Sequence, residues 1–177
     1  MIRKIIPFLI PVVMFATEIS GIYINRYKAS SDEFYTIVEN MLQNNMNAAV
    51  IDIKYDRGET AFMPEGYNIP NAYQPIPDII KKVAYLKQNG IRPIARIVCF
   101  KDPTLGIYDN SKYAVRYTDK TVFKDLGNAV WVSPYSDFVQ NYIIDIAKEA
   151  VKAGFEEIQF DYIRFPCDFP EGVPVQP

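Results

Sequence analysis

The sequence predicts an α/β fold with a parallel sheet, of the (β/α) TIM-barrel type and apparently truncated after about four βα units. Strand and helix patterns alternate along the chain, with no hairpin signal between them. Helix-to-strand turns are short and strand-to-helix connections are long, as in barrels whose active-site loops gather at the carboxyl ends of the strands. The last strand pattern ends on charged residues, Asp161 and Arg164. A doubly wound sheet is the alternative, but no glycine-rich phosphate turn follows the first strand.

Composition excludes several classes of function. The chain has 177 residues, 49% of them hydrophobic, which is enough for a sizeable core. Its net charge is −2 and it has no basic run, so we expect no nucleic-acid partner. It has no histidine, which excludes His-ligated zinc and Ser-His-Asp or Cys-His catalysis within this chain. We expect no metal and no cofactor, and acid-base chemistry falls to carboxylates, Tyr, Lys or Cys.

Two cysteines, Cys99 and Cys167, are the only ones in the sequence. Their spacing is not that of metal ligands. Both follow predicted strands, so a disulfide between them is an open alternative in an exported protein.

The N-terminus, residues 1–17, predicts a leader. Two basic residues precede an apolar run at 5–16, which is the pattern of a signal peptide. The run is too short for a comfortable membrane span. We therefore expect a protein exported to the cell envelope or beyond, or tethered to the membrane at its N-terminus. The alternative is a buried first segment of the fold. With 1–17 as a leader, we expect residues 18–177 to form the N-terminal half of a barrel.

The first half of that domain contains two predicted strands and one helix. The first strand covers 19–24. Ser30, with Glu33 three residues later, forms a capping-box pattern that opens a helix ending at 44–45. The short apolar run at 48–54 predicts a strand covered on both faces.

The second half repeats the pattern with longer loops. After a polar loop, Pro77 opens a helix that Gly90 ends. A third strand is predicted at 92–98, followed by a connection of about thirty-five residues that is rich in aromatic side chains. The pair 133–134 opens the third helix, and a fourth, buried strand runs from Phe155 towards Asp161.

Four blocks of sequence resemble a bacterial family of predicted glycoside hydrolases, envelope proteins with a (β/α)8 barrel. They are residues 50–54 (VIDIK), 94–103 (IARIVCFKDP), 131–135 (WVSPY) and 147–166. The resemblance covers nearly everything from 21 to 166, in order. It implies hydrolysis of an O-glycosidic bond in an envelope or extracellular polysaccharide.

The family domain is roughly twice this length, so the resemblance implies that the chain supplies strands one to four of the eight. Such a half-barrel exposes two unpaired sheet edges. We therefore expect a carbohydrate substrate and, as a partner, either a complementary half-barrel or a second copy of the chain.

Two carboxylates are the candidate catalytic groups. Asp161 lies at the end of the fourth strand, where the resemblance implies a nucleophile; the alternative is a structural ion pair with Arg164. Asp52 lies at the end of the second strand and faces the same mouth; the alternative is that it caps local backbone donors.

Three residues are candidate substrate-binding groups: Arg96, Arg164 and Trp131. Arg96 lies among apolar residues, where a charge is costly unless paired, so we expect it to point towards Asp52 or Asp161 and keep a carboxylate ionised. Trp131, the sole tryptophan, would stack on a sugar ring or anchor the long loop.

Lys54, Lys101 and Asp102 are weaker candidates, and we expect Lys101 and Asp102 to form a solvated pair. No general acid can be named, because in comparable barrels it comes from a later strand. A non-catalytic carbohydrate-binding module and an inactive gene fragment are the two alternatives to a hydrolase.

Overall fold

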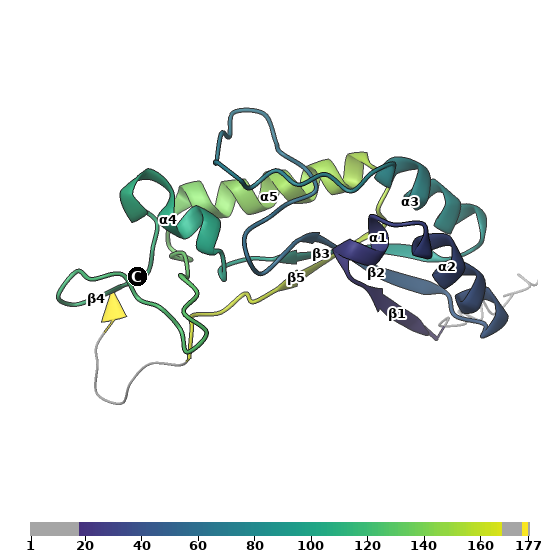
Figure 1. The fold of residues 1–177 in the computed structure, drawn as a ribbon, viewed down its shortest axis with the longest axis horizontal. Helices are drawn as coiled ribbons and strands as arrows, with labels where there is room; N and C mark the ends of the chain where they lie inside the picture. Colours follow the sequence, from purple (N-terminus) through teal and green to yellow (C-terminus); the bar gives the residue numbers. More distant parts are fainter. Residues whose placement is uncertain (1–17, 168–174, 177) are drawn as a thin grey trace, which may run out of the picture.

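The computed structural model describes residues 18–167 and 175–176. Its centre is a parallel sheet of four strands in the order β1-β2-β3-β5 (Figure 1). The strands are β1 (Gly21–Ile24), β2 (Ala48–Lys54), β3 (Arg92–Val98) and β5 (Glu157–Asp161). Each neighbouring pair is parallel, as predicted. The predicted leader at 1–17 lies outside the described residues.

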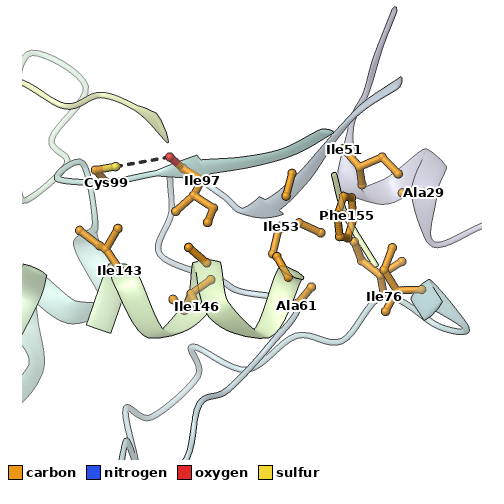
Figure 2. Close-up of a cluster of buried hydrophobic side chains, with 14 of the residues drawn as sticks. Ala29, Ile51, Ile53, Ala61, Ile76, Ile97, Cys99, Ile143, Ile146 and Phe155 are labelled. Atoms are coloured by element: carbon orange, nitrogen blue, oxygen red, sulfur yellow. Dashed lines mark hydrogen bonds between the residues drawn. The ribbon is translucent and has the colours of Figure 1, made fainter. Parts of the chain in front are cut away.

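Three long helices cover one face of this sheet: α2 (Glu33–Gln43), α3 (Ile79–Gln88) and α5 (Asp137–Lys152). Buried side chains of the helices pack against the outward-facing residues of the strands, for example Ile146 of α5 with the cluster that contains Ile53 and Ile97 (Figure 2). These apolar residues recur at helical spacing, so one stripe of each helix is buried. The alternate residues of the strands, Asp52 and Arg96 among them, lie on the opposite face of the sheet.

The starts of the helices differ from the predictions. Asn25 caps a short helix, α1 (Arg26–Ala29), and Ser30 is the C-cap of that helix. The predicted capping box is therefore wrong, since Ser30 has helical backbone angles, and α2 begins at Glu33. Helix α5 begins at Asp137 rather than at 133–134, because the side chain of Ser136 accepts the hydrogen bond from the N–H of Val139.

Pro77 does not open α3. Asp78 occupies the N-cap position with a left-handed φ of 53°, and the helix begins at Ile79. Of the apolar residues at helical spacing in α3, Ile79, Val83 and Leu86 are buried, whereas Ile80 and Ala84 are exposed. The predicted helix end at Gly90 is confirmed. Gly90 follows α3 with a positive φ, which suits glycine, and Gly154 follows α5 in the same way.

The long connection after β3 has regular structure that the sequence did not predict. It contains α4 (Pro103–Ser111) and β4 (Arg116–Tyr117), which pairs antiparallel with β6 (Val175–Gln176). Strand β5 was predicted to be buried, and this is wrong. It is the edge of the described sheet, and Phe160 is 42% exposed.

The two cysteines are not joined, and no described helix could span a membrane. No disulfide joins Cys99 to Cys167 in the structure. Cys99 is buried, which raises the pKa of its thiol to about 11, and its sulfur donates to the carbonyl of Ile97. None of the helices within 18–167 is both long and apolar enough to cross a bilayer.

Candidate active site

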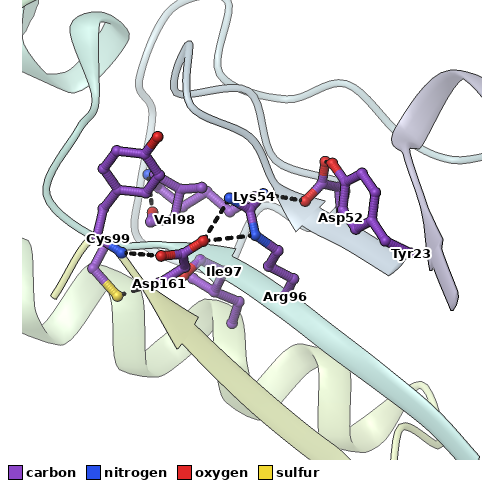
Figure 3. Close-up of polar contacts among 9 residues, drawn as sticks. Tyr23, Asp52, Lys54, Arg96, Ile97, Val98, Cys99 and Asp161 are labelled. Carbon is purple, nitrogen blue, oxygen red and sulfur yellow. Dashed lines mark hydrogen bonds and ion pairs between the residues drawn. The ribbon is translucent and has the colours of Figure 1, made fainter. Parts of the chain in front are cut away.

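A line of polar side chains crosses the face of the sheet opposite the helices (Figure 3). It runs from Tyr23 on β1 through Asp52 on β2 and Arg96 on β3 to Asp161 at the end of β5. Side chains alternate along a strand, and residues 51, 53, 95 and 97 belong to the core under the helices. Their neighbours at 52 and 96 therefore face the other way.

Arg96 lies between the two carboxylates and binds both. Its Nη1 is 2.5 Å from Oδ1 of Asp52, and its Nε and Nη2 are 2.9 Å and 2.7 Å from Oδ2 of Asp161. Asp52 is directly opposite Arg96 in the ladder, whereas Asp161 pairs with Val98 and so lies nearer the carboxyl end of the sheet. Burial alone would lower the pKa of Arg96, but the hydrogen bonds to both carboxylates outweigh it and raise the pKa.

Asp161 is the accessible carboxylate of the line, since its side chain is 40% exposed and that of Asp52 is buried. Its Oδ1 accepts a hydrogen bond of 2.7 Å from the backbone N–H of Tyr162. Burial favours the neutral acid, but the bonds from Arg96 and Tyr162 and the charges of Arg96 and Arg164 prevail, so the pKa of Asp161 is lowered. Asp161 is therefore ionised at neutral pH, which suits a nucleophile or an electrostatic stabiliser and not a general acid.

Asp52 is fully buried, and side chains occupy both of its oxygens. The hydroxyl of Tyr23 donates to Oδ2, and Arg96 donates to Oδ1. Burial and the hydrogen bond to Asp52 raise the pKa of Tyr23. Because Asp52 is within β2 and bound to side chains rather than to backbone donors, it acts on the site by holding Arg96.

Arg164 and Trp131 do not line the site as free binding groups. Trp131 is 2% exposed, its Nε1 donates to Asp125 at 3.0 Å, and the guanidinium of Arg164 lies 5.1 Å from its ring. This geometry favours the loop-anchor alternative for Trp131. Arg164 is exposed and contributes its charge, but the ion pair of Asp161 is with Arg96.

Tyr23 and Tyr162 were missed by the sequence reasoning. The strict alternation of strand residues could have placed Tyr23 on the inner face, because its neighbour Ile24 is fully buried in the core. Tyr162 follows Asp161 directly and has a φ of 52°, a left-handed conformation that is strained for an aromatic residue. That backbone turn brings its N–H to the Asp161 carboxylate, and no residue pattern signals it.

A second, fully buried ion pair lies beside this line. Nζ of Lys54 is 2.8 Å from Oδ2 of Asp102 and donates to the carbonyl of Val98 at 2.8 Å. Asp102 also caps α4 by accepting a 2.8 Å bond from the N–H of Leu105. The pair joins the end of β2 to the start of α4.

The predicted solvated pair of Lys101 and Asp102 is therefore wrong. Lys101 instead lies 3.7 Å from Asp56 and 3.8 Å from Asp125. Two neighbouring residues with opposite charge need not pair when a buried partner on another element is available. Within the part of the chain that the structure describes, no group of three or more His, Cys, Asp or Glu side chains is arranged to hold a metal ion.

Solved structures are similar in fold to this chain. A hypothetical protein from Ruminiclostridium thermocellum is 37% identical with a TM-score of 0.73, and the match covers 81% of this chain and 77% of that one. An α-xylosidase from a soil metagenome matches at 16% identity and a TM-score of 0.54, and the α-galactosidase of Lactobacillus brevis at 13% and 0.57. These two matches cover 80% and 81% of this chain but only 21% and 20% of the enzymes, so they show the fold of part of a TIM-barrel domain.

Comparison of the amino-acid sequence with known protein families identifies the family of this chain. No match was found among curated protein sequences. A family model with the description "Putative glycosyl hydrolase domain" matches residues 21–173, which include all four strands of the parallel sheet. The chain belongs to this glycosyl hydrolase-like family.

Proposed function

We propose that this domain takes part in the hydrolysis of O-glycosidic bonds, with Asp161 as the carboxylate that faces the sugar. The observation that carries this proposal is an accessible, ionised carboxylate at the carboxyl end of a barrel strand, fixed by Arg96. The family match supports the reaction class.

Asp161 would act on the anomeric carbon as a nucleophile or stabilise positive charge that develops on the sugar ring. Its lowered pKa keeps it unprotonated for either role. Asp52 cannot be the second reacting carboxyl group, because Tyr23 and Arg96 occupy its oxygens. The general acid would come from a barrel strand beyond the four described here, and a complementary half-barrel is one source of such a strand.

The proposed substrate is an envelope or extracellular polysaccharide. The support is the basic and apolar pattern of residues 1–17, which is typical of an exported protein. Among the described strands β5 is an edge strand, and its exposed Phe160 supports the packing of a further strand beside it.

The test is a hydrolysis assay on the completed barrel. The chain is fused or mixed with the remaining strands of a longer family member, and reducing ends are measured over a panel of oligosaccharides. We expect Asp161→Asn to lower the rate by about a thousandfold or more. Asp119→Asn, a surface change in the long loop, serves as the matched control and should leave the rate unchanged. Full activity in Asp161→Asn would refute the assignment.

A carbohydrate-binding module without turnover is the second candidate. It is favoured by the line of polar residues itself, in which Asp161 is the accessible carboxylate and Asp52 is closed off. Binding of an oligosaccharide by the completed barrel, with no hydrolysis of any member of the panel, would select this candidate.

A further inference from the structure

Three tyrosines gather at the carboxyl ends of β1 and β2, beside Asp52. Tyr23 is 51% exposed and Tyr27, in α1 just beyond β1, is 62% exposed. Tyr55 follows β2 directly and is half-buried. The rings of Tyr27 and Tyr55 meet edge to face, 6.3 Å apart between centroids. None of these side chains was singled out from the sequence.

Tyr23 connects this group to the carboxylates. Its hydroxyl donates to Asp52, and the guanidinium carbon of Arg96 lies 5.7 Å from the centre of its ring. Arg96 in turn binds Asp161. The ring of Tyr23 is thus one side chain away from the accessible carboxylate, and half of its surface is open to solvent.

Exposed aromatic rings beside a polar site are suited to sugars. The face of an aromatic ring carries partial negative charge, and the C–H groups on one face of a pyranose ring carry partial positive charge, so the two stack. Trp131 cannot supply this face, because it is buried under Arg164. Tyr23 and Tyr27 have rings exposed enough to supply it.

We propose that Tyr23 and Tyr27, supported by Tyr55, form a platform that binds a pyranose ring of an oligosaccharide next to Asp161. This inference rests on the proposed function, because it takes Asp161 as the group that faces the scissile bond. In this platform Tyr23 has two separate roles. Its ring stacks on the sugar, and its hydroxyl group binds Asp52, which in turn binds Arg96.

The experiment measures binding of xylopentaose, cellopentaose, chitopentaose and maltopentaose to the full chain by isothermal titration calorimetry. We expect at least one of them to bind. Tyr23→Leu and Tyr27→Leu should each weaken that binding by about threefold or more, from the loss of one stacking contact. Tyr23→Phe keeps the ring and should bind within about twofold of wild type. Tyr35→Leu, on the helix side of the molecule and packed against Tyr85, is the matched control and should bind as wild type.

Unchanged binding in both Tyr23→Leu and Tyr27→Leu would overturn the platform, and so would the absence of binding of all four sugars to wild type. Tyr27 is largely exposed, so Tyr27→Leu tests the platform even if Tyr23→Leu fails to fold. Failure of the platform differs from failure of the proposed function, which is judged by hydrolysis in Asp161→Asn. Hydrolysis that persists in Asp161→Asn would refute the assignment of Asp161 as the nucleophile, and it would not change the result of the binding experiment.

Discussion

Arg96 is the residue on which the candidate site depends, because one guanidinium neutralises a buried carboxylate and orients an accessible one. A charge on a central strand is tolerated only when it is paired, and here the pairing is shared between β2 and β5. The same contacts keep Asp161 ionised. The geometry of the site therefore follows from one side chain.

Arg96→Gln should destabilise the fold strongly. Asp52 would remain buried with its charge only partly compensated, at a cost of about 3 kcal/mol in the free energy of unfolding. Arg92→Gln is the control on the same strand, since its exposed pair with Glu157 is 3.5 Å long and is worth less than about 1 kcal/mol. Urea unfolding measures both. Equal losses in the two variants would contradict the role given to Arg96.

The pH dependence of stability should report Asp161. Its pKa is lowered in the folded protein, so the native state favours the ionised form and binds fewer protons than the unfolded chain. The stabilisation is present above the unfolded pKa of about 4 and is lost as the pH falls through the folded pKa. We expect the urea midpoint of wild type to fall more steeply below pH 5 than that of Asp161→Asn. Parallel curves would exclude this contribution.

At the scale of single residues, burial cost made Arg96 predictable, since an unpaired charge inside a strand is excluded and only carboxylates on neighbouring strands were available. Tyr162 was not predictable, because a left-handed φ at an aromatic residue contradicts local propensity and is imposed by the surrounding structure. The two aspartates differ in exposure: Asp161 is accessible and Asp52 is buried. This difference could not be predicted from the sequence.

Among the elements, the connection between β2 and α4 depends on the buried pair of Lys54 and Asp102. We expect Lys54→Met to cost about 3 kcal/mol, because Asp102 keeps an uncompensated charge. Adding Asp102→Asn should recover part of this loss, since asparagine can still cap α4. Lys101→Met, whose partners are 3.7 Å and 3.8 Å away, should cost less than about 1 kcal/mol. Additive losses in the double variant, measured by thermal unfolding, would show that the two residues are not coupled.

Strands β2 and β3 were predicted with their observed bounds, because each is a short and largely apolar run between polar segments. Helix starts were predicted less well. Ser30, Ser133 and Ser136 are all acceptable caps by residue type, and tertiary contacts decide among them. Strands β4 and β6 are short and pair across a long separation, so neither has a local signal.

At the scale of the whole molecule, an apolar surface is exposed beside β5 and α5, and we call it the open flank. Phe160 of β5 and Ile144 and Val151 of α5 are exposed. Phe160 and Ile144 line two adjoining apolar hollows of about 330 and 430 Å³, and Val151 lines the larger one. The two central strands, β2 and β3, have a neighbouring strand on each side. The parallel order of the strands was predictable from alternation, and an open sheet edge was expected from the resemblance to half of a barrel. The structure adds that the exposed apolar residues at this edge lie on β5 and α5.

The open flank should make the isolated chain self-associate. We expect Phe160→Lys to reduce association in sedimentation velocity measurements, because a charge on an edge strand opposes further pairing. Leu126→Lys replaces a leucine that is 91% exposed in a loop, and it should leave association unchanged. Equal effects of the two substitutions would assign association to general surface hydrophobicity.

The central claim is that Arg96 holds Asp161 as an ionised carboxylate at the carboxyl end of the sheet. Site-specific ¹³C NMR titration of the Asp161 carboxyl carbon tests it most directly, in wild type and in Arg96→Lys, which keeps a positive charge but loses the planar fork. The account predicts a wild-type pKa below the ordinary aspartate value of about 4 and a higher pKa in the variant. A wild-type pKa at or above that value, or one that does not move in the variant, would contradict it.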